Sequence, residues 1–318
     1  MDMDIVACTD TNYIMPTGVM MYSVCLNNAG NPITFHLIID DGVSDIQKEE
    51  LRKTVCSFAN TSLSFYRIDG DKYRKLPGRL DHPTITQATY YRLDLANILS
   101  PDIDKVLYLD GDIICRKSLT DLWNTDISQY AVAGVHDVCE KLYEKNNHLH
   151  LYPWKGYFNA GVLLINLKWW RENNSTALFY EFISQHGDWL KYQDQDVLNY
   201  VFNEHKLLLP IKYNLATTFL TKKDFKNYSN QLAEAIPDPV IIHYIVGKPW
   251  QLSCRHPYRN AFLKYKSQTI WKDEPLQEDR PLSLRIKKAI GKVLRKLNLI
   301  SELPPYGKEF LPYLKPLD

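Results

Sequence analysis

The sequence lacks the features that mark several common classes of protein. Its six cysteines form no C-x-x-C pair, so neither the usual spacing of a zinc site nor a small disulfide framework is visible. No apolar run approaches the roughly 18 to 20 residues of a membrane-spanning helix. The N-terminus, Met1-Asp2-Met3-Asp4, is acidic where a secretory signal would be basic and then apolar. We therefore expect a cytoplasmic protein with reduced thiols.

Several catalytic motifs and a strong net charge are missing as well. The chain has no P-loop, no G-x-G-x-x-G, no H-E-x-x-H and no G-x-S-x-G, which removes the main support for kinase-like, dinucleotide-dependent and serine-hydrolase activities. The net charge is only +1, which argues against nucleic acid as a partner of the main domain. The charge is uneven, because residues 281–318 hold eight Lys and Arg against three Asp and Glu. This asymmetry predicts a separate partner for the tail.

What is present is an ordinary folded composition with alternating strand-like and helix-like segments. The 318 residues are 45% hydrophobic, enough for one large domain or two small ones. Ser44 and Gln47 have the spacing of a capping box and predict a helix to about Cys56, with Ile46, Leu51 and Val55 facing inward. The alternation predicts an α/β fold with a mixed, mainly parallel sheet. We expect strands over 5–8, 33–39, 62–68, 105–109, 132–135 and 162–166, and helices over 18–28, 45–56, 87–99 and 174–184.

The composition changes near residue 272. Residues 272–281 are charged and bracketed by prolines, as in a linker, so we expect a catalytic domain over 1–271 and a linker with tail over 272–318. Within 283–300, apolar residues recur at steps of three and four with Lys and Arg between them, which predicts a basic amphipathic helix. Such a helix either packs on the body or adsorbs to an anionic membrane surface.

The segment Tyr108-Leu109-Asp110-Gly111-Asp112 places two carboxylates just after a strand-like run. At the end of a strand both can turn toward one hard cation, which would neutralise a departing phosphate group. Two acids near a turn need no metal, however, and a solvated loop end is the alternative for this motif alone. Its position at the carboxyl edge of a parallel sheet favours a ligand site.

His243 follows the apolar run 240–242, and Gly247 and Lys248 come shortly after it. A glycine lets the backbone approach a phosphate, and a lysine can place an ammonium group on it. The alternative for His243 is a hydrogen-bonded histidine of the core.

Two further segments carry polar or small side chains. Residues 156–162 place small residues between aromatics before a strand, which suits either a sugar-sized ligand or a tight turn. Residues 192–199 open a helix with two acids and two amides, where one acid is explained by capping.

Six blocks of sequence, spread over about 250 residues, stand out together. They are DIVACTDTNY at 4–13, ATYYRLDL at 88–95, KVLYLDGDI at 105–113, YFNAGVLLINL at 157–167, YQDQDVLN at 192–199 and IHYIVGKPW at 242–250. In this order the blocks resemble retaining glycosyltransferase family 8, and most closely the bacterial α-galactosyltransferases of lipooligosaccharide synthesis. The resemblance implies a GT-A fold, a single Rossmann-like α/β domain that binds a nucleotide sugar with a divalent cation.

The same resemblance implies roles for individual residues. The implied metal ligands, for Mn²⁺ or Mg²⁺, are Asp110, Asp112 and His243. The implied donor-binding residues are Asp10 and Asn12 at the uridine, Tyr13 on the base, Arg92 near the sugar and diphosphate, Gly111 in the acidic motif, Asn159 at the hexose, and Gly247 and Lys248 at the diphosphate. Asp194 and Gln195 are implied at the transferred hexose as catalytic residues. The loosely matching stretch 80–86 offers His82 as a candidate acceptor contact.

The resemblance therefore predicts a retaining hexosyltransferase that uses a UDP-hexose, with galactose favoured over glucose, and a glycan or glycolipid acceptor of lipopolysaccharide assembly. The basic amphipathic pattern of 283–300 separately predicts that the protein adsorbs to the inner face of the cell membrane, where a lipid-linked acceptor would lie. Retention needs either a far-face nucleophile or a front-face departure and attack. Because the amide of Gln195 is a poor nucleophile, we favour the front-face route. The alternatives are a protein-directed or self-glycosylating transferase, a non-catalytic nucleotide-sugar-binding protein, and a metal-dependent phosphohydrolase or nucleotidyltransferase.

Overall fold

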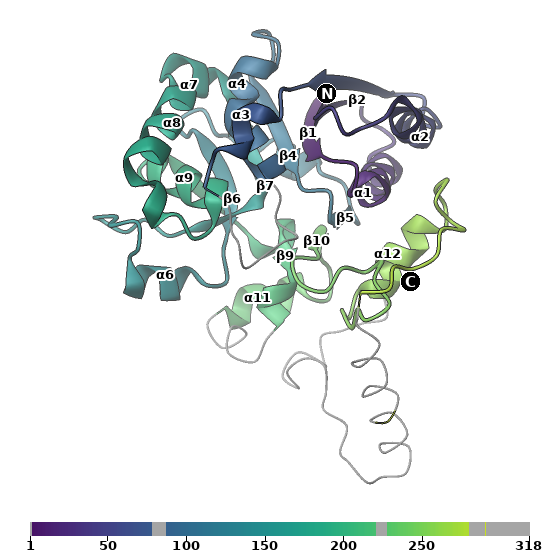
Figure 1. Ribbon diagram of the computed structural model, residues 1–318. Coiled ribbons are helices and arrows are strands. Elements are labelled where there is room, and N and C mark those ends of the chain that lie inside the picture. Colours follow the sequence, from purple (N-terminus) through teal and green to yellow (C-terminus); the bar gives the residue numbers. More distant parts are fainter. Residues whose placement is uncertain (1, 78–86, 221–227, 280–289, 291–318) are drawn as a thin grey trace.

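A seven-stranded sheet with the order β3-β2-β1-β4-β7-β6-β8 runs through the body of the protein (Figure 1). The structure is a computed structural model that describes residues 2–77, 87–220, 228–279 and 290. The strands of the large sheet are β1 Met3–Thr9, β2 Ile33–Ile39, β3 Thr61–Arg67, β4 Lys105–Leu109, β6 Val132–His136, β7 Phe158–Asn166 and β8 Lys206–Leu209. A second, three-stranded sheet has the order β5-β10-β9, from Ile113–Cys115, Ile241–His243 and Leu215–Ala216.

The large sheet is mixed and mainly parallel, as the sequence predicts. β1 pairs in parallel with β2 and with β4. The pairs β2–β3 and β6–β8 are also parallel. β7 is antiparallel to both of its neighbours, β4 and β6. In this register Leu109 pairs with Val162, so the end of β4 lies beside the middle of β7.

The helices cover both faces of this sheet (Figure 1). On one side lie α1 Ile14–Asn27, α2 Asp45–Val55 and α12 Arg259–Lys266. On the other lie η1 Gln87–Asp94, α4 Leu95–Ile98, α7 Leu167–Glu172, α8 Ser175–His186 and α9 Gln193–Val201. The remaining segments are α3 Asp71–Arg74, α5 Thr120–Trp123, α6 Glu140–Asn146, η2 Gly187–Trp189, η3 Ile211–Tyr213, η4 Thr217–Leu220 and α11 Ser229–Ala235.

Two hydrophobic cores hold these layers together. Successive side chains of a strand point to opposite faces, and β4 shows this directly: Leu107 packs in the core with α1, whereas Val106 and Tyr108 pack in the core with α8 and α9. Each such apolar side chain contributes roughly 1.5–3 kcal/mol when fully buried. The centre of the sheet is therefore buried on both faces, which explains why β4 is almost continuously apolar, whereas the edge strand β3 has no buried residue.

The capping box at Ser44 and Gln47 is present, and it starts α2. The prediction that Ile46 faces inward was wrong, because its side chain is 75% exposed. Five positions separate Ile46 from the buried Leu51, which is roughly 140° around a helix of 3.6 residues per turn. The segment predicted as a helix over 87–99 is helical, but its first part, η1, is a 3₁₀ helix.

Residues 271–279, where the sequence predicts a boundary and a linker, lie against the body. The Trp271 ring packs on Gly18 of α1, where a Cβ atom would lie only 2.1 Å from the ring. Gln277 forms a parallel bridge with Gln251. Asp279 accepts a hydrogen bond from the backbone N–H of Ser253 at 3.0 Å. The first part of the predicted linker is therefore docked, while the predicted amphipathic helix 283–300 lies outside the described residues except for Ile290.

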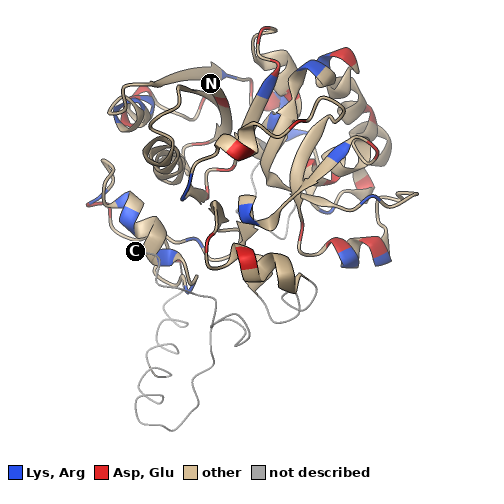
Figure 2. Cartoon of the chain, turned by 180° about the vertical axis from the view of Figure 1, so that it is seen from behind, with Lys and Arg blue, Asp and Glu red and all other residues tan. Residues whose placement is uncertain are grey.

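Acidic and basic residues are interspersed over the outer helices and loops of the body (Figure 2). All six cysteines belong to the described part of the chain, and none of them is in a disulfide. A search of the described helices finds none with the length and hydrophobicity required to cross a bilayer.

Candidate active site

A cavity of about 430 Å³ opens where the ends of β1, β4 and β10 meet the start of β7 and of α9. Eleven of the thirteen residues that the sequence marks as candidates line it. The two that do not are Asn12 and Gly247. The stretch 80–86, with the candidate acceptor contact His82, lies outside the described residues. The lining candidates are Asp10, Tyr13, Arg92, Asp110, Gly111, Asp112, Asn159, Asp194, Gln195, His243 and Lys248.

The acidic motif sits in a tight bend between the two sheets. The Asp110 N–H donates to the carbonyl of Gly161 at 2.8 Å, and the carbonyl of Asp112 accepts the Tyr244 N–H at 2.9 Å. Gly111 has no room for a side chain, because a Cβ atom there would lie 2.6 Å from Oγ1 of Thr17 in α1. This close approach explains why a glycine separates the two carboxylates.

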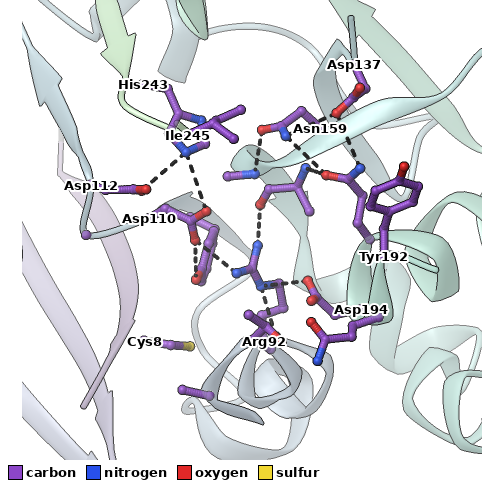
Figure 3. A pocket seen from close by; sticks show the side chains of 18 of the residues that line it. Cys8, Arg92, Asp110, Asp112, Asp137, Asn159, Tyr192, Asp194, His243 and Ile245 are labelled. Carbon is purple, nitrogen blue, oxygen red and sulfur yellow. Dashed lines mark hydrogen bonds and ion pairs between the residues drawn. The ribbon is translucent and has the colours of Figure 1, made fainter. Parts of the chain in front are cut away.

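The side chains of Asp110, Asp112 and His243 converge on one point (Figure 3). Their ligand atoms all lie within 4.8 Å of one another. Nε2 of His243 is 3.2 Å from Asp112 Oδ1 and 3.8 Å from Asp110 Oδ2. Two carboxylate oxygens and one imidazole nitrogen form a donor set that suits Mn²⁺ or Mg²⁺.

Gly161 shapes the space beside this donor set. A Cβ atom at position 161 would lie 2.2 Å from Cε1 of His243 and 2.7 Å from Oδ2 of Asp110. The missing side chain leaves a cradle between two of the three ligands, and the residues present therefore fit a bound divalent cation.

Arg92 lies between two acids in the floor of the cavity (Figure 3). Its guanidinium is 2.9 Å from Asp110 Oδ1 and 3.1 Å from Asp194 Oδ2, and it also donates to the carbonyl of Ala160. The Tyr108 hydroxyl donates to the same Asp110 Oδ1 at 2.9 Å. These contacts occupy Oδ1 of Asp110 and leave Oδ2 facing His243. Burial raises the pKa of Asp194 to about 6, although the charge of Arg92 opposes this rise.

Lys248 contacts the candidate metal triad at Asp112, whereas Arg92 contacts it at Asp110. Its ammonium donates to Asp112 Oδ2 and, at 2.9 Å, to the carbonyl of Tyr244. Burial alone would raise the pKa of Asp112, but Lys248 and His243 outweigh it and hold that pKa well below its usual value. Likewise burial lowers the pKa of Lys248, yet Asp112 more than offsets this and raises it. The pair is charged, and the ammonium lies directly beside the candidate cation site.

Asn159 and Gln195 meet over the start of β7. Gln195 Oε1 accepts hydrogen bonds from the backbone N–H of Ala160 at 3.0 Å and from Asn159 Nδ2 at 3.1 Å. Both lone pairs of this oxygen are therefore engaged, which weakens it as a nucleophile. Its Nε2 donates to Asp137 Oδ2 at 3.4 Å and to the Tyr157 hydroxyl at 3.3 Å.

The residues expected at the uridine form one wall. Asp10 Oδ1 accepts the Asn12 N–H at 2.8 Å, so Asn12 orients Asp10 through its backbone while its own side chain is exposed. The Tyr13 ring packs edge-on against Trp250, with 5.8 Å between the centroids. Gly247 adopts a φ of +74°, a conformation that favours glycine, and it turns the chain toward Lys248.

Two expectations about local structure need correction. Of the small residues of 156–162 only Gly156 precedes the strand, since β7 begins at Phe158 and holds Asn159, Ala160 and Gly161 within it. No side chain caps α9 from its N-cap position. Instead Asp196, inside the helix, accepts the backbone N–H groups of Lys191 and Tyr192 at 2.7 and 2.8 Å.

Sequence reasoning missed Asp137 and Asn214. Asp137 lines the cavity, and burial raises its pKa. Asn214 is fully buried behind His243. Both are isolated polar residues outside every motif considered, so neither carried a signal in the sequence.

The mixed sheet, the cavity at its carboxyl edge and the candidate metal triad define a GT-A-like protein. A model of "Glycosyl transferase family 8" matches residues 4–254. The chain belongs to this family.

Individual relatives and a solved structure agree with this assignment. The chain is 31% identical over 273 residues to a lipopolysaccharide 1,2-glucosyltransferase of Escherichia coli, covering 85% of this chain and 79% of that protein. It is 29% identical over 268 residues to a lipopolysaccharide 1,3-galactosyltransferase of Salmonella typhimurium, covering 82% and 77%. The crystal structure of the galactosyltransferase LgtC with donor and acceptor sugar analogs superimposes with a TM-score of 0.75 at 28% identity, covering 90% of this chain and all of that one.

Proposed function

We propose that this protein is a metal-dependent retaining transferase that moves a hexose from a UDP-hexose to a glycan acceptor of lipopolysaccharide or lipooligosaccharide. Galactose is the favoured hexose and glucose the next. The observation that carries the proposal is the convergence of Asp110, Asp112 and His243 beside Lys248 in the cavity at the carboxyl edge of the sheet. The relatives named above act on lipopolysaccharide with both sugars, which supports the acceptor class and leaves the choice of sugar to experiment.

In this proposal the metal is Mn²⁺ or Mg²⁺, held by Asp110, Asp112 and His243. When bound, the cation supplies positive charge to the diphosphate of the donor. Lys248 adds a second positive charge on the same side of the cavity and stabilises the negative charge that develops on UDP as it leaves. The short Gly247 turn sets Lys248 in position. Asp10, oriented by the backbone of Asn12, binds the uridine, and Tyr13 lies against the base.

The sugar occupies the floor between Arg92, Asn159 and Asp194. Arg92 reaches both the Asp110 carboxylate and Asp194, so it can orient the hexose and the diphosphate together. Asp194 orients sugar hydroxyls. Gln195 stabilises the positive charge that builds on the anomeric centre, and its engaged oxygen supports the front-face route over a far-face attack.

We also propose that the enzyme acts at the cytoplasmic face of the membrane and that residues 283–300 adsorb to anionic lipid there. Each Lys or Arg near such a surface is worth about 1 kcal/mol. A lipid-linked acceptor would make this adsorption useful. The support is the sequence pattern alone, since this segment lies outside the described residues.

The experiment is a panel of UDP-sugars with and without Mn²⁺, with the released nucleotide identified by chromatography. UDP released from one donor, only when metal is present, supports the proposal and identifies the sugar. UMP or a sugar phosphate would instead show cleavage of a different bond, and the transferase proposal would be wrong. Intact-mass analysis of the protein after incubation separates self-glycosylation, which adds the mass of a hexose to the chain, from transfer to a glycan.

A further inference from the structure

The amide groups around β7 have orientations that the backbone dictates. A backbone N–H group can only donate a hydrogen bond. The Gly161 N–H points at the side-chain atom Oδ1 of Asn159 at 3.0 Å. The Ala160 N–H points at Oε1 of Gln195, also at 3.0 Å. Both atoms must therefore be carbonyl oxygens. It follows that Asn159 presents its Nδ2 to Gln195, at 3.1 Å.

This polarity continues behind the cavity wall to His243. Asn159 Oδ1 accepts a hydrogen bond from Asn214 Nδ2 at 2.9 Å, so Asn214 turns its Oδ1 the other way. That Oδ1 lies 2.9 Å from Nδ1 of His243. Because a carbonyl oxygen can only accept, Nδ1 must carry a proton, so in the neutral ring it is Nε2 that holds the lone pair. Nε2 is the atom that faces Asp112 and Asp110.

Asn214 is therefore bonded at both ends to residues of the site. Asn28, another buried asparagine, bonds to no residue that lines the cavity: its Oδ1 accepts the Leu119 N–H at 2.7 Å, and its Nδ2 donates to the Val24 carbonyl at 2.9 Å and to Cys115 Sγ at 3.8 Å. Asn28 therefore stabilises the fold away from the cavity, whereas Asn214 connects Asn159 with His243.

We propose that Asn214 is a positioning residue that joins the metal site to the Gln195 amide. One end fixes the His243 tautomer in which Nε2 can bind a cation, and the other end, through Asn159, fixes Gln195 beneath the transferred sugar. The inference rests on the proposed function and deepens it, since it assigns one buried side chain to both metal binding and sugar transfer. Partners that orient a metal-binding histidine typically affect metal affinity ten- to a hundredfold.

The test compares Asn214→Ala, Asn214→Asp and the matched control Asn28→Ala in the full chain. We expect Asn214→Ala to weaken Mn²⁺ binding, measured by calorimetry, ten- to a hundredfold, and to lower kcat at saturating Mn²⁺ at least tenfold. Asn214→Asp keeps the acceptor for His243 but loses the donor to Asn159. It should hold the Mn²⁺ affinity within about threefold of wild type while kcat falls at least tenfold. Asn28→Ala should lower the melting temperature and leave Mn²⁺ affinity and kcat unchanged.

Wild-type Mn²⁺ affinity and kcat in Asn214→Ala would overturn the proposal, as would an equal loss of both in Asn28→Ala. If Asn214→Ala fails to fold, an unchanged kcat in Asn214→Asp overturns the link to Gln195. Nitrogen NMR of His243 gives a readout independent of turnover: the wild type should show Nδ1–H, and Asn214→Asp should retain it. A wild type that shows Nδ1–H but neither binds Mn²⁺ nor consumes UDP-sugars would refute the proposed function and leave the positioning of His243 supported.

Discussion

Nε2 of His243 lies 3.2 Å from Oδ1 of Asp112 because β10 runs antiparallel to β5, with His243 opposite Ile113. Asp110, in contrast, stands at the end of β4 in the large sheet. The candidate metal site is thus assembled from two sheets and depends on how they pack. Five predictions test the site, the fold and the tail.

Asp112→Asn should abolish most activity, because it removes the carboxylate that faces both His243 and Lys248. We expect kcat to fall about a hundredfold or more, as for the loss of a charge-stabilising group. Steady-state kinetics over a Mn²⁺ titration measure this. The control is Asp102→Asn, an exposed acid in a loop. Activity within a few-fold of wild type in Asp112→Asn would contradict the assignment of Asp112 as a ligand.

Gly161→Ala should disrupt the metal site without removing any ligand. The added Cβ atom would lie 2.2 Å from His243 Cε1, a distance at which the imidazole must move. We expect at least tenfold weaker Mn²⁺ binding by calorimetry. Gly30→Ala is the matched control, since a Cβ atom there meets nothing within 4 Å. Equal Mn²⁺ affinity in the two variants would show that this cradle does not hold the metal.

Gln195→Ala should lower kcat by at least tenfold and change KM for the donor much less, because its proposed role is to stabilise charge that develops only during transfer. The exposed Gln185→Ala serves as the control. Near wild-type turnover in Gln195→Ala would leave neither a nucleophilic nor a stabilising role for this side chain.

His256 should make the fold sensitive to acid. Burial lowers the pKa of His256 to about 3, whereas the unfolded chain protonates it near 6.5. Below pH 6.5 the His256 imidazole therefore binds a proton in the unfolded state but not in the folded state. The free energy of unfolding falls as pH falls. Between pH 7.5 and 5 this loss should be about 2 kcal/mol.

Urea unfolding at the two pH values measures the loss. His256→Gln should lose about 2 kcal/mol less than wild type over this range, and His205→Gln, at an exposed position, should behave like wild type. Identical pH dependence in His256→Gln and wild type would contradict the prediction.

Deletion of residues 282–318 should abolish binding to anionic vesicles and leave transfer to a soluble acceptor unchanged. A full-length variant with the six Lys and Arg of 283–300 changed to Gln tests whether charge is responsible, and it should also fail to bind. Co-sedimentation with vesicles of phosphatidylglycerol measures both. Undiminished binding after the deletion would refute the membrane assignment.

Much of the fold could be predicted from the sequence because its signals are local. The run 105–109 and the capping box at Ser44 depend on neighbouring residues only, and both are confirmed. The motif blocks likewise placed Asp110, Asp112 and His243 in one site, where the structure brings them together.

The remaining features depend on contacts between distant segments. The reversed direction of β7 brings Gly161 to the carboxyl edge of β4, and nothing within 157–167 signals that reversal. Asn214 gains its importance only from the placement of His243 and Asn159 on either side of it. Ile46 was mispredicted because an apolar residue near the start of a helix fits the inward pattern until its angle to Leu51 is considered.

The packing of Trp271 against Gly18 has a practical consequence for obtaining crystals. A shortened chain that ended at residue 270 would strip a large aromatic side chain from the first helix and expose an apolar surface there. A shortened chain that ends after Asp279 keeps the packing of Trp271 on Gly18. It also keeps the bridge of Gln277 to Gln251 and the hydrogen bond from Ser253 to Asp279. Residue 279 is therefore the better end point for recombinant production.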